Sequence, residues 1–191
     1  MTEVLSEREL DRGFSHQVQD LPGAGGLEKC IQCGTCSGSC QMSARMDYTP
    51  RRLIEMARVG MKREVLSSRA IWYCASCYSC TVRCPRGINI TEVMSGLKSL
   101  AIKNEMCSRR DDGPAFYTSF YDVIKRYGRL HEGSVIAGFA WKTNPWRLWG
   151  MAPLGWKMFL SGNLEVLPEK IKKPAEISLL LEKLGGGVMK R

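Results

Sequence analysis

A chain of 191 residues with 28 Lys or Arg against 19 Asp or Glu carries a formal net charge of +9. This length suits one substantial domain, or a small domain with a long appendage, and leaves little room for two unrelated domains. The basic residues are scattered among acids, unlike the continuous basic stripe of a nucleic-acid-binding surface. We therefore expect the charge to compensate bound anionic groups and to serve docking to other proteins, with no nucleic acid as a partner.

Two further absences bear on where the protein works. The start, MTEVLSERELDRGF, is charged throughout and has no apolar stretch like that of a secretory signal. No window reaches the roughly 18 consecutive apolar residues of a membrane-spanning helix, because residues 133–160 are broken by Lys142, Asn144, Arg147 and Lys157. We expect a cytoplasmic protein without direct membrane insertion. In that reducing compartment its nine cysteines indicate metal binding rather than disulfides.

Residues 1–26 are predicted to form an N-terminal arm, with a short helix around Val4 to Arg12 and a turn-rich end, LPGAGG. Two apolar side chains in this region, Phe14 and Val18, have two interpretations. They pack on the chain's own domain, or they anchor the arm to a partner.

Two cysteine runs follow. CIQCGTCSGSC, residues 30–40, has gaps of two, two and three residues between its cysteines, and the same spacing returns in CASCYSCTVRCP, residues 74–85. Most intervening residues are small, which lets backbone N–H groups approach whatever the thiols bind. The runs differ at one place, since Pro85 follows the last cysteine of the second run whereas Gln41 follows that of the first.

The segments around the runs are predicted to be helical. Thr49 and Pro50 form a helix start, apolar residues then recur at helical spacing, and Gly60 ends the helix. A second helix is predicted from Arg63 to Ala70, and a third from about Glu92 to Asn104 with Thr91 as its cap. Strand-like alternation is nearly absent, so residues 27–108 are predicted to form a mainly α domain that contains both cysteine runs.

A polar break at residues 105–114 begins a helical C-terminal extension, residues 109–191. Helices are predicted at residues 115–127, 134–141, 154–160 and 176–184. The extension contains Trp141, Trp146, Trp149 and Trp156 among basic residues. They fit a docking surface for a partner subunit, packing within a second helical layer, or contact with a membrane surface; the weak regular patterning favours docking.

The cysteine spacing favours iron–sulfur clusters over zinc. A zinc site takes four ligands, usually from two separated pairs, whereas each run here crowds three cysteines into seven residues and adds a fourth. This resembles the bacterial ferredoxin pattern, in which three thiolates of a run hold one [4Fe-4S] cluster and the fourth ligates the other. The resemblance assigns one cluster to Cys30, Cys33, Cys36 and Cys84, and the second to Cys74, Cys77, Cys80 and Cys40. It implies that residues 27–108 form an α-helical ferredoxin-like dicluster domain.

The remaining polar residues of chemical interest are few. Cys107 belongs to neither run and is expected to be a buried, inert thiol, with a ligand or redox role as the alternative. His16 and His131 lack a convincing catalytic partner and are expected at the surface. Three arginines near the cysteines either raise cluster potentials or are ordinary solvated charges: Arg45, Arg83 and Arg86.

The whole pattern resembles the HdrC family, the C subunits of heterodisulfide reductases and related complexes. The resemblance rests on the two runs, on GINITEVM after the second, and on NPWRLWGMAPLGWKMFLSGNLEVLPEKIK in the extension. It implies a non-catalytic electron-transfer subunit with two [4Fe-4S] clusters. Its implied partners are an HdrA-like flavin and iron–sulfur subunit and an HdrB-like subunit with CCG domains, in a complex of thiol, disulfide or sulfur metabolism.

Nothing in the residues themselves conflicts with an electron relay. The chain has no G-x-G-x-x-G or P-loop motif, and with eight thiols committed no open iron site is left for a substrate. Two other functions stay open. One is the iron–sulfur subunit of a membrane-linked dehydrogenase that passes electrons towards quinone; the other is a zinc-dependent nucleic-acid binder.

Overall fold

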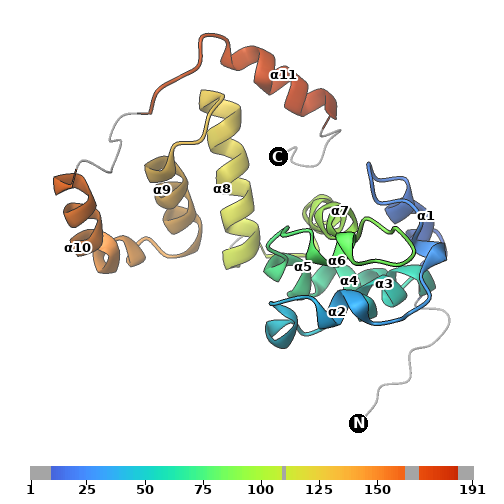
Figure 1. Ribbon diagram of the computed structural model, residues 1–191. Coiled ribbons are helices and arrows are strands. Elements are labelled where there is room, and N and C mark those ends of the chain that lie inside the picture. Colours follow the sequence, from blue (N-terminus) through green and yellow to red (C-terminus); the bar gives the residue numbers. More distant parts are fainter. Residues whose placement is uncertain (1–9, 109–110, 162–167, 185–191) are drawn as a thin grey trace. The chain divides into compact units, whose positions relative to one another are not determined.

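The computed structural model describes residues 10–108, 111–161 and 168–184, and the described part is helical, without strands. The mainly α prediction is therefore confirmed. The chain divides into two compact units, Met1–Met106 and Cys107–Arg191. In chain order (Figure 1), the elements of the first unit are α1 (Phe14–Gln19), η2 (Leu27–Lys29), α2 (Thr35–Gly38), η3 (Ser43–Arg45), α3 (Pro50–Val59), α4 (Lys62–Ser67), α5 (Ala70–Tyr73), α6 (Ser79–Val82) and α7 (Ile90–Lys103).

Helix α3 follows the local signals of the sequence. It begins at Pro50, whose fixed φ suits a first helical position, and ends before Gly60, which has a φ of 88°. A Cβ at Gly60 would lie 2.5 Å from the carbonyl oxygen of Asp11, so both the backbone conformation and the close approach require glycine. The predicted start and end of this helix are confirmed.

Helix α7 begins two residues earlier than predicted, at Ile90, with Asn89 at the N-cap position. Assigning the cap to Thr91 was wrong. Thr91 lies in the first turn, and its backbone N–H donates to the hydroxyl oxygen of Thr81 at 3.1 Å. The acceptor at this helix end comes from α6, ten residues upstream, which local sequence signals cannot reveal.

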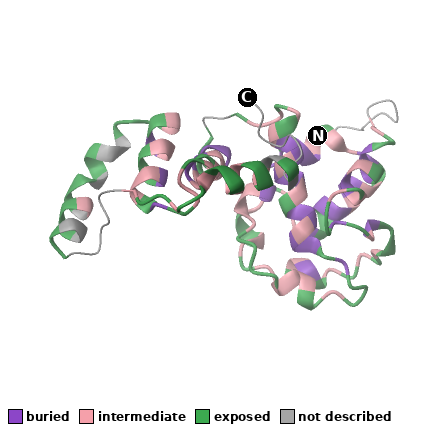
Figure 2. Cartoon of the chain, turned by 90° about the horizontal axis from the view of Figure 1, so that it is seen from above, coloured by how far each residue is buried: buried purple, intermediate pink, exposed green. Residues whose placement is uncertain are grey.

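The core of the first unit lies between α1, α3, α4, α5 and α7, which pack against one another. Figure 2 shows the buried residues of the chain in purple. Phe14 and Val18 are fully buried in it, so these side chains pack on the chain's own domain. The helix predicted from Val4 to Arg12 falls mostly outside the described residues, and Leu10, Asp11 and Arg12 are not helical. The helix in this region is α1, which packs against α3 and α7.

The second unit contains α8 (Asp112–Tyr127), α9 (Glu132–Thr143), α10 (Arg147–Leu160) and α11 (Pro174–Leu184). All four predicted helices are found, each longer than expected. Helix α8 packs against α9 and α11. The small buried core of this unit includes Ala115, Val123, Val135 and Ala140.

Two expectations for single residues need correction. His131 is buried, not at the surface: it is the N-cap of α9, and its Nδ1 accepts from the backbone N–H of Ser134 at 3.1 Å. Cys107, expected to be buried, is partly exposed, because it lies in the connection between α7 and α8 rather than inside a helix. His16 is exposed, as predicted.

The tryptophans of the extension are not core residues. Their exposed fractions lie between 66% and 80% for Trp141, Trp146, Trp149 and Trp156. Packing within a second helical layer is therefore not what the described structure shows. Among the residues that the structure describes, no helix has the length and apolar character needed to cross a membrane.

Candidate metal centre

The two cysteine runs fold into loops of the same conformation, which we name the first cysteine loop (residues 30–40) and the second cysteine loop (residues 74–84). In each, the third and fifth residues have left-handed backbone: φ is 56° and 81° at Gln32 and Gly34, and 52° and 60° at Ser76 and Tyr78. A one-turn helix follows in both loops, α2 in the first and α6 in the second, and the two helices pack against each other. The repeated spacing in the sequence is thus a repeated three-dimensional structure.

Each loop contributes three cysteines to one cavity and the fourth to the other. A first cavity of about 370 Å³, open to solvent, is lined by Cys30, Cys33, Cys36 and Cys84. A second, of about 580 Å³, is lined by Cys40, Cys74, Cys77 and Cys80. Ile90, at the start of α7, lines both, so the cavities are neighbours.

The composition of these walls bears on what the cavities can hold. Apart from the thiols, apolar side chains such as Ile54 and Ile88 line the first, and Pro50 and Met94 line the second. Within the described residues, no three Cys, His, Asp or Glu side chains are grouped as they would be around one metal ion; the thiols instead surround two spaces. Four thiols around an apolar-walled cavity fit the ligand set of a [4Fe-4S] cluster.

The thiols differ in how readily they lose the proton that metal ligation requires. The Thr35 hydroxyl, 3.4 Å from the sulfur of Cys33, lowers the pKa of that exposed thiol. Hydrogen bonding with the backbone and the hydroxyl of Ser79 lowers the pKa of Cys77, the corresponding residue of the second loop. Burial raises the pKa of Cys36 and of Cys40.

Two sulfurs of the first cavity accept hydrogen bonds from N–H groups. The side-chain amide of Gln32 donates to Cys30 Sγ at 3.4 Å, and the backbone N–H of Ile88 donates to Cys84 Sγ at 3.4 Å. In the second cavity, the hydroxyl of Thr91 lies 3.8 Å from Cys80 Sγ. Such contacts are among the features that set cluster potentials.

A basic side chain holds the first cysteine of each loop by its backbone carbonyl. Arg58 of α3 donates to the carbonyl of Cys30 at 3.3 Å, and Lys98 of α7 donates to the carbonyl of Cys74 at 3.0 Å. Lys98 is only 6% exposed. The sequence analysis identified neither residue. Each is far from its cysteine along the chain, and the sequence around it indicates only that it belongs to a helix.

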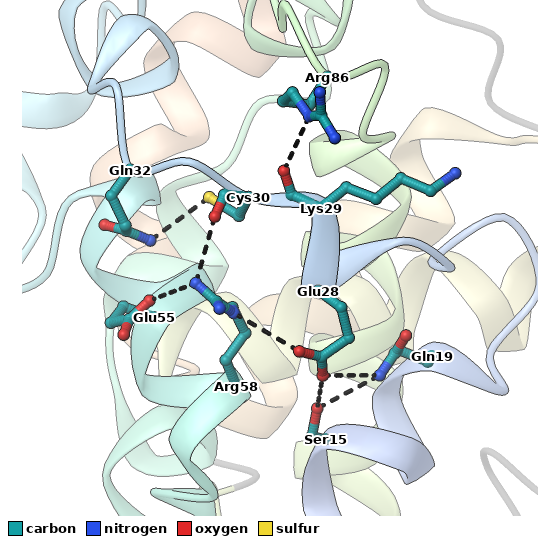
Figure 3. A network of polar contacts seen from close by, with 9 residues as sticks. All are labelled: Ser15, Gln19, Glu28, Lys29, Cys30, Gln32, Glu55, Arg58 and Arg86. Carbon is teal, nitrogen blue, oxygen red and sulfur yellow. Dashed lines mark hydrogen bonds and ion pairs between the residues drawn. The ribbon is translucent and has the colours of Figure 1, made fainter.

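Arg58 belongs to a network that ties the first loop to α1 and α3 (Figure 3). It donates to Glu55 at 3.0 Å, and its Nε lies 3.9 Å from a carboxylate oxygen of Glu28. Glu28 accepts in turn from Ser15 and Gln19 at 3.1 and 3.2 Å. The approach to Cys30 is thereby fixed from two helices.

The second loop has a different anchor. The carboxylate of Asp47 accepts from the backbone N–H groups of Arg69 and Ala70 at 2.9 and 2.8 Å, and from the hydroxyl of Ser68 at 2.9 Å. These bonds cap α5, which leads directly into Cys74. Partial burial alone would raise the pKa of Asp47, but the hydrogen bonds outweigh it and hold that pKa below its usual value.

This anchor also corrects the helix predicted from Arg63 to Ala70. The structure has two short helices there, α4 and α5, and the chain is extended at Ser68, where φ is −65° and ψ is 141°. The hydroxyl of Ser68 and the backbone N–H groups after it turn to Asp47 instead of continuing the helix. The break therefore depends on a carboxylate 21 residues upstream of Ser68.

The three arginines singled out in the sequence have different surroundings. Arg86, on the second loop's exit, lines the first cavity and donates through Nε to the carbonyl of Lys29 at 3.1 Å (Figure 3). It therefore links the segment after the second loop to η2, directly before the first loop. Arg45 and Arg83 are exposed, and Arg51, which the sequence did not single out, also lines the first cavity.

Comparison with known proteins agrees with this geometry. The family model of the 4Fe-4S dicluster domain matches residues 26–88. Residues 26–88 are thus similar to the 4Fe-4S dicluster domain family. The match spans both cysteine loops of the domain and the helices α3, α4 and α5 between them.

Curated relatives point to one kind of complex. Over 100 residues the chain is 40% identical to the C subunit of the H(2):CoB-CoM heterodisulfide,ferredoxin reductase of Methanothermobacter thermautotrophicus, covering 52% of this chain and 54% of the relative. It is 44% identical over 92 residues to the C subunit of the Ferredoxin:CoB-CoM heterodisulfide reductase of Methanosarcina mazei, covering 47% of this chain and 56% of the relative. The chain thus spans about half the length of these relatives. The resemblance to the C subunits of heterodisulfide reductases is confirmed over that part.

Proposed function

We propose that the chain is an electron-transfer subunit with two [4Fe-4S] clusters in a heterodisulfide-reductase-like complex. The observation that carries the proposal is the pair of neighbouring cavities, each lined by four cysteines and sharing Ile90 as a wall. A [4Fe-4S] cluster takes up and releases one electron. The chain's thiols would hold the clusters, with apolar side chains such as Ile54 and Met94 beside them.

The ligand sets are part of this proposal. Cys30, Cys33, Cys36 and Cys84 would hold one cluster, and Cys40, Cys74, Cys77 and Cys80 the other. The way the structure groups these side chains around two cavities supports the assignment. It also places all eight thiols of the two loops on cavity walls, which suits a relay that passes electrons and leaves substrate chemistry to another subunit.

The relatives' names describe subunits of heterodisulfide reductases, which supports a place in a complex of several subunits. We propose an HdrA-like flavin and iron–sulfur subunit on one side of the relay and an HdrB-like CCG-domain subunit on the other, in the cytoplasm. Disulfide or sulfur chemistry would take place on the HdrB-like subunit.

Anaerobic purification with iron and acid-labile sulfide analysis tests the function directly. About eight iron and eight sulfide per chain are expected, with EPR of the dithionite-reduced protein showing two [4Fe-4S] centres. Stoichiometric zinc without sulfide, under strictly anaerobic handling, would overturn both the ligand assignment and the relay.

The second unit is proposed to dock on a partner subunit. Residues 133–164 contain no Asp or Glu, three Lys or Arg and four tryptophans, and those tryptophans are exposed. On α10, Trp149, Trp156 and Leu160 recur at helical spacing, and all are exposed. Exposed tryptophans flanked by basic residues are typical anchors for a partner with apolar pockets and an acidic rim.

Replacing both Trp149 and Trp156 by Ser should lower the affinity for the HdrB-like or HdrA-like subunit at least tenfold, because interface tryptophans often contribute about 2 kcal/mol or more. The loss should be visible as reduced co-elution with the co-expressed subunit. Iron content should not change. The double replacement Leu179→Ser and Leu180→Ser, at exposed positions of α11, serves as the control. Equal effects of the two double variants would argue against a docking surface at the tryptophans.

A further inference from the structure

The two cavities differ in the side chain at one equivalent position. The third residue of the first cysteine loop is Gln32, and the third residue of the second is Ser76. Both have left-handed backbone, with φ of 56° and 52°. This conformation is unfavourable for residues with a Cβ, and since both loops adopt it, it belongs to the loop. What differs is the group that the side chain carries.

Gln32 is placed to act on the sulfur of Cys30. Its amide nitrogen donates to Cys30 Sγ at 3.4 Å, and Figure 3 shows the amide directed at that sulfur while Arg58 holds the carbonyl of the same cysteine. The hydrogen bond from Arg58 of α3 holds the backbone of Cys30 in place beside Gln32. The side chain of Ser76 ends one atom beyond its Cβ and has no amide to offer.

Hydrogen bonds to cluster sulfurs are one of the determinants of reduction potential. Uptake of one electron makes a cluster and its thiolates more negative by one charge, with no bond broken and no proton moved. An N–H dipole directed at a ligand sulfur stabilises the more negative state more than the less negative one. It therefore favours reduction of the cluster that this sulfur binds.

We propose that Gln32 raises the reduction potential of the cluster bound in the first cavity, without a corresponding effect on the second. The electron would come from the relay's donor, a low-potential reductant for which dithionite substitutes in solution. The inference rests on the proposed function, because it requires clusters in both cavities. In this proposal, a side chain that is not a ligand makes the reduction potentials of two geometrically similar sites different.

The test is a redox titration of the full-length chain, loaded with iron and sulfide under anaerobic conditions and followed by EPR. Gln32→Met keeps the length of the side chain and removes the donor. We expect the ratio of reduced to oxidised first-cavity cluster, at a fixed potential, to fall several-fold and up to tenfold; a tenfold change corresponds to about 59 mV for one electron. The signal absent from Cys84→Ser identifies that cluster.

Two further variants make the experiment decisive. Gln32→Asn tolerates left-handed backbone well, but its amide is too short to reach the sulfur in the same way, so it should shift the same signal in the same direction. Ser76→Ala, at the equivalent position of the second loop, should leave the first-cavity potential at its wild-type value.

Unchanged first-cavity potentials in both Gln32 variants, at full iron content, would overturn this inference and leave the proposed function intact. A shift confined to the second cluster would also overturn it. Iron and sulfide analysis before the titration separates these results from failure of the proposed function, which would appear as a wild-type chain unable to bind clusters.

Discussion

The fifth residue is Gly34 in the first cysteine loop and Tyr78 in the second, and both have left-handed backbone. Glycine adopts this conformation freely, whereas a residue with a Cβ bears a cost of about 1 kcal/mol. The Tyr78 hydroxyl donates to Glu92 of α7 at 2.7 Å, a contact that helps to hold the residue in place. Both loops thus adopt the same left-handed backbone at their fifth residue. The first loop does so with a glycine, and the second with a tyrosine that is held by a hydrogen bond.

The side chains that hold the two loops in place are also alike in kind but different in origin. Both loops have a cation on the carbonyl of their first cysteine, but Arg58 comes from α3 and Lys98 from α7. Both have an acidic anchor before that cysteine, but Glu28 pairs with side chains whereas Asp47 caps a helix. A repeated cysteine motif therefore does not imply repeated surroundings, and differences between the two sites should be sought there.

The largest expected effect concerns the exchange of the fourth cysteine between the loops. Cys84→Ser should remove the cluster of the first cavity and Cys40→Ser that of the second, each lowering the iron content to about half. Cys30→Ser and Cys74→Ser provide the references, because Cys84→Ser should lose the same EPR signal as Cys30→Ser. Loss of a common signal in Cys84→Ser and Cys74→Ser would show that each loop binds its own cluster.

The two cations should differ in their contribution to stability. Lys98→Met leaves the carbonyl of Cys74 without this buried donor and should lower the free energy of unfolding by about 2 kcal/mol. The more exposed Arg58 should cost about 1 kcal/mol when changed to Met, since water can replace it. Anaerobic denaturant unfolding measures both, with Lys103→Met at an exposed position of α7 as the control. A Lys98 variant as stable as the Lys103 variant would contradict the assignment.

The smallest effect concerns the anchor of the second loop. Asp47→Asn should lower the free energy of unfolding by about 1 kcal/mol at neutral pH, a value reduced by the exposure of the carboxylate. Because the pKa of Asp47 is lowered in the folded state, its contribution is complete above its usual pKa of 3.8 and is lost as the pH falls through the folded value.

The measurement is the difference in unfolding free energy between wild type and Asp47→Asn at each pH. It should stay constant from about pH 7 to about pH 4 and shrink below that. Taking the difference removes acid effects on other groups that both proteins share. A difference that grows towards acid pH would mean that the neutral carboxyl is the form that the fold favours.

The sequence was informative where structure depends on neighbouring residues. Pro50 and Gly60 mark the ends of α3 because a fixed φ and a left-handed φ are properties of single residues. The prediction failed at Thr91 because the acceptor for this helix end is supplied by Thr81 across a loop. His131, expected at the surface, is buried as a helix cap for the same kind of reason: its partner is set by the fold.

For the candidate site, the resemblance of the cysteine runs to the bacterial ferredoxin pattern implied how the cysteines group, and the structure lines two cavities with those groups. That they are ligands stays a prediction. The residues that could make the cavities unequal were not predictable. Gln32 lies two residues after Cys30, but the sequence does not show where its amide points. Lys98 and Lys103 both belong to α7 and differ in the face of the helix on which they lie.

The helical segment between the loops also determines how the chain can change in length. Residues 41–73 leave one loop and return to the other, so the two proposed clusters would close this part of the chain as a cross-link does. Doubling the length of a closed flexible segment adds only about 0.6 kcal/mol in entropy, whereas one residue added within a cysteine run moves a thiol by up to about 3.8 Å. Insertions at the turn after Gly60 should thus be far better tolerated than a single insertion between Cys33 and Cys36.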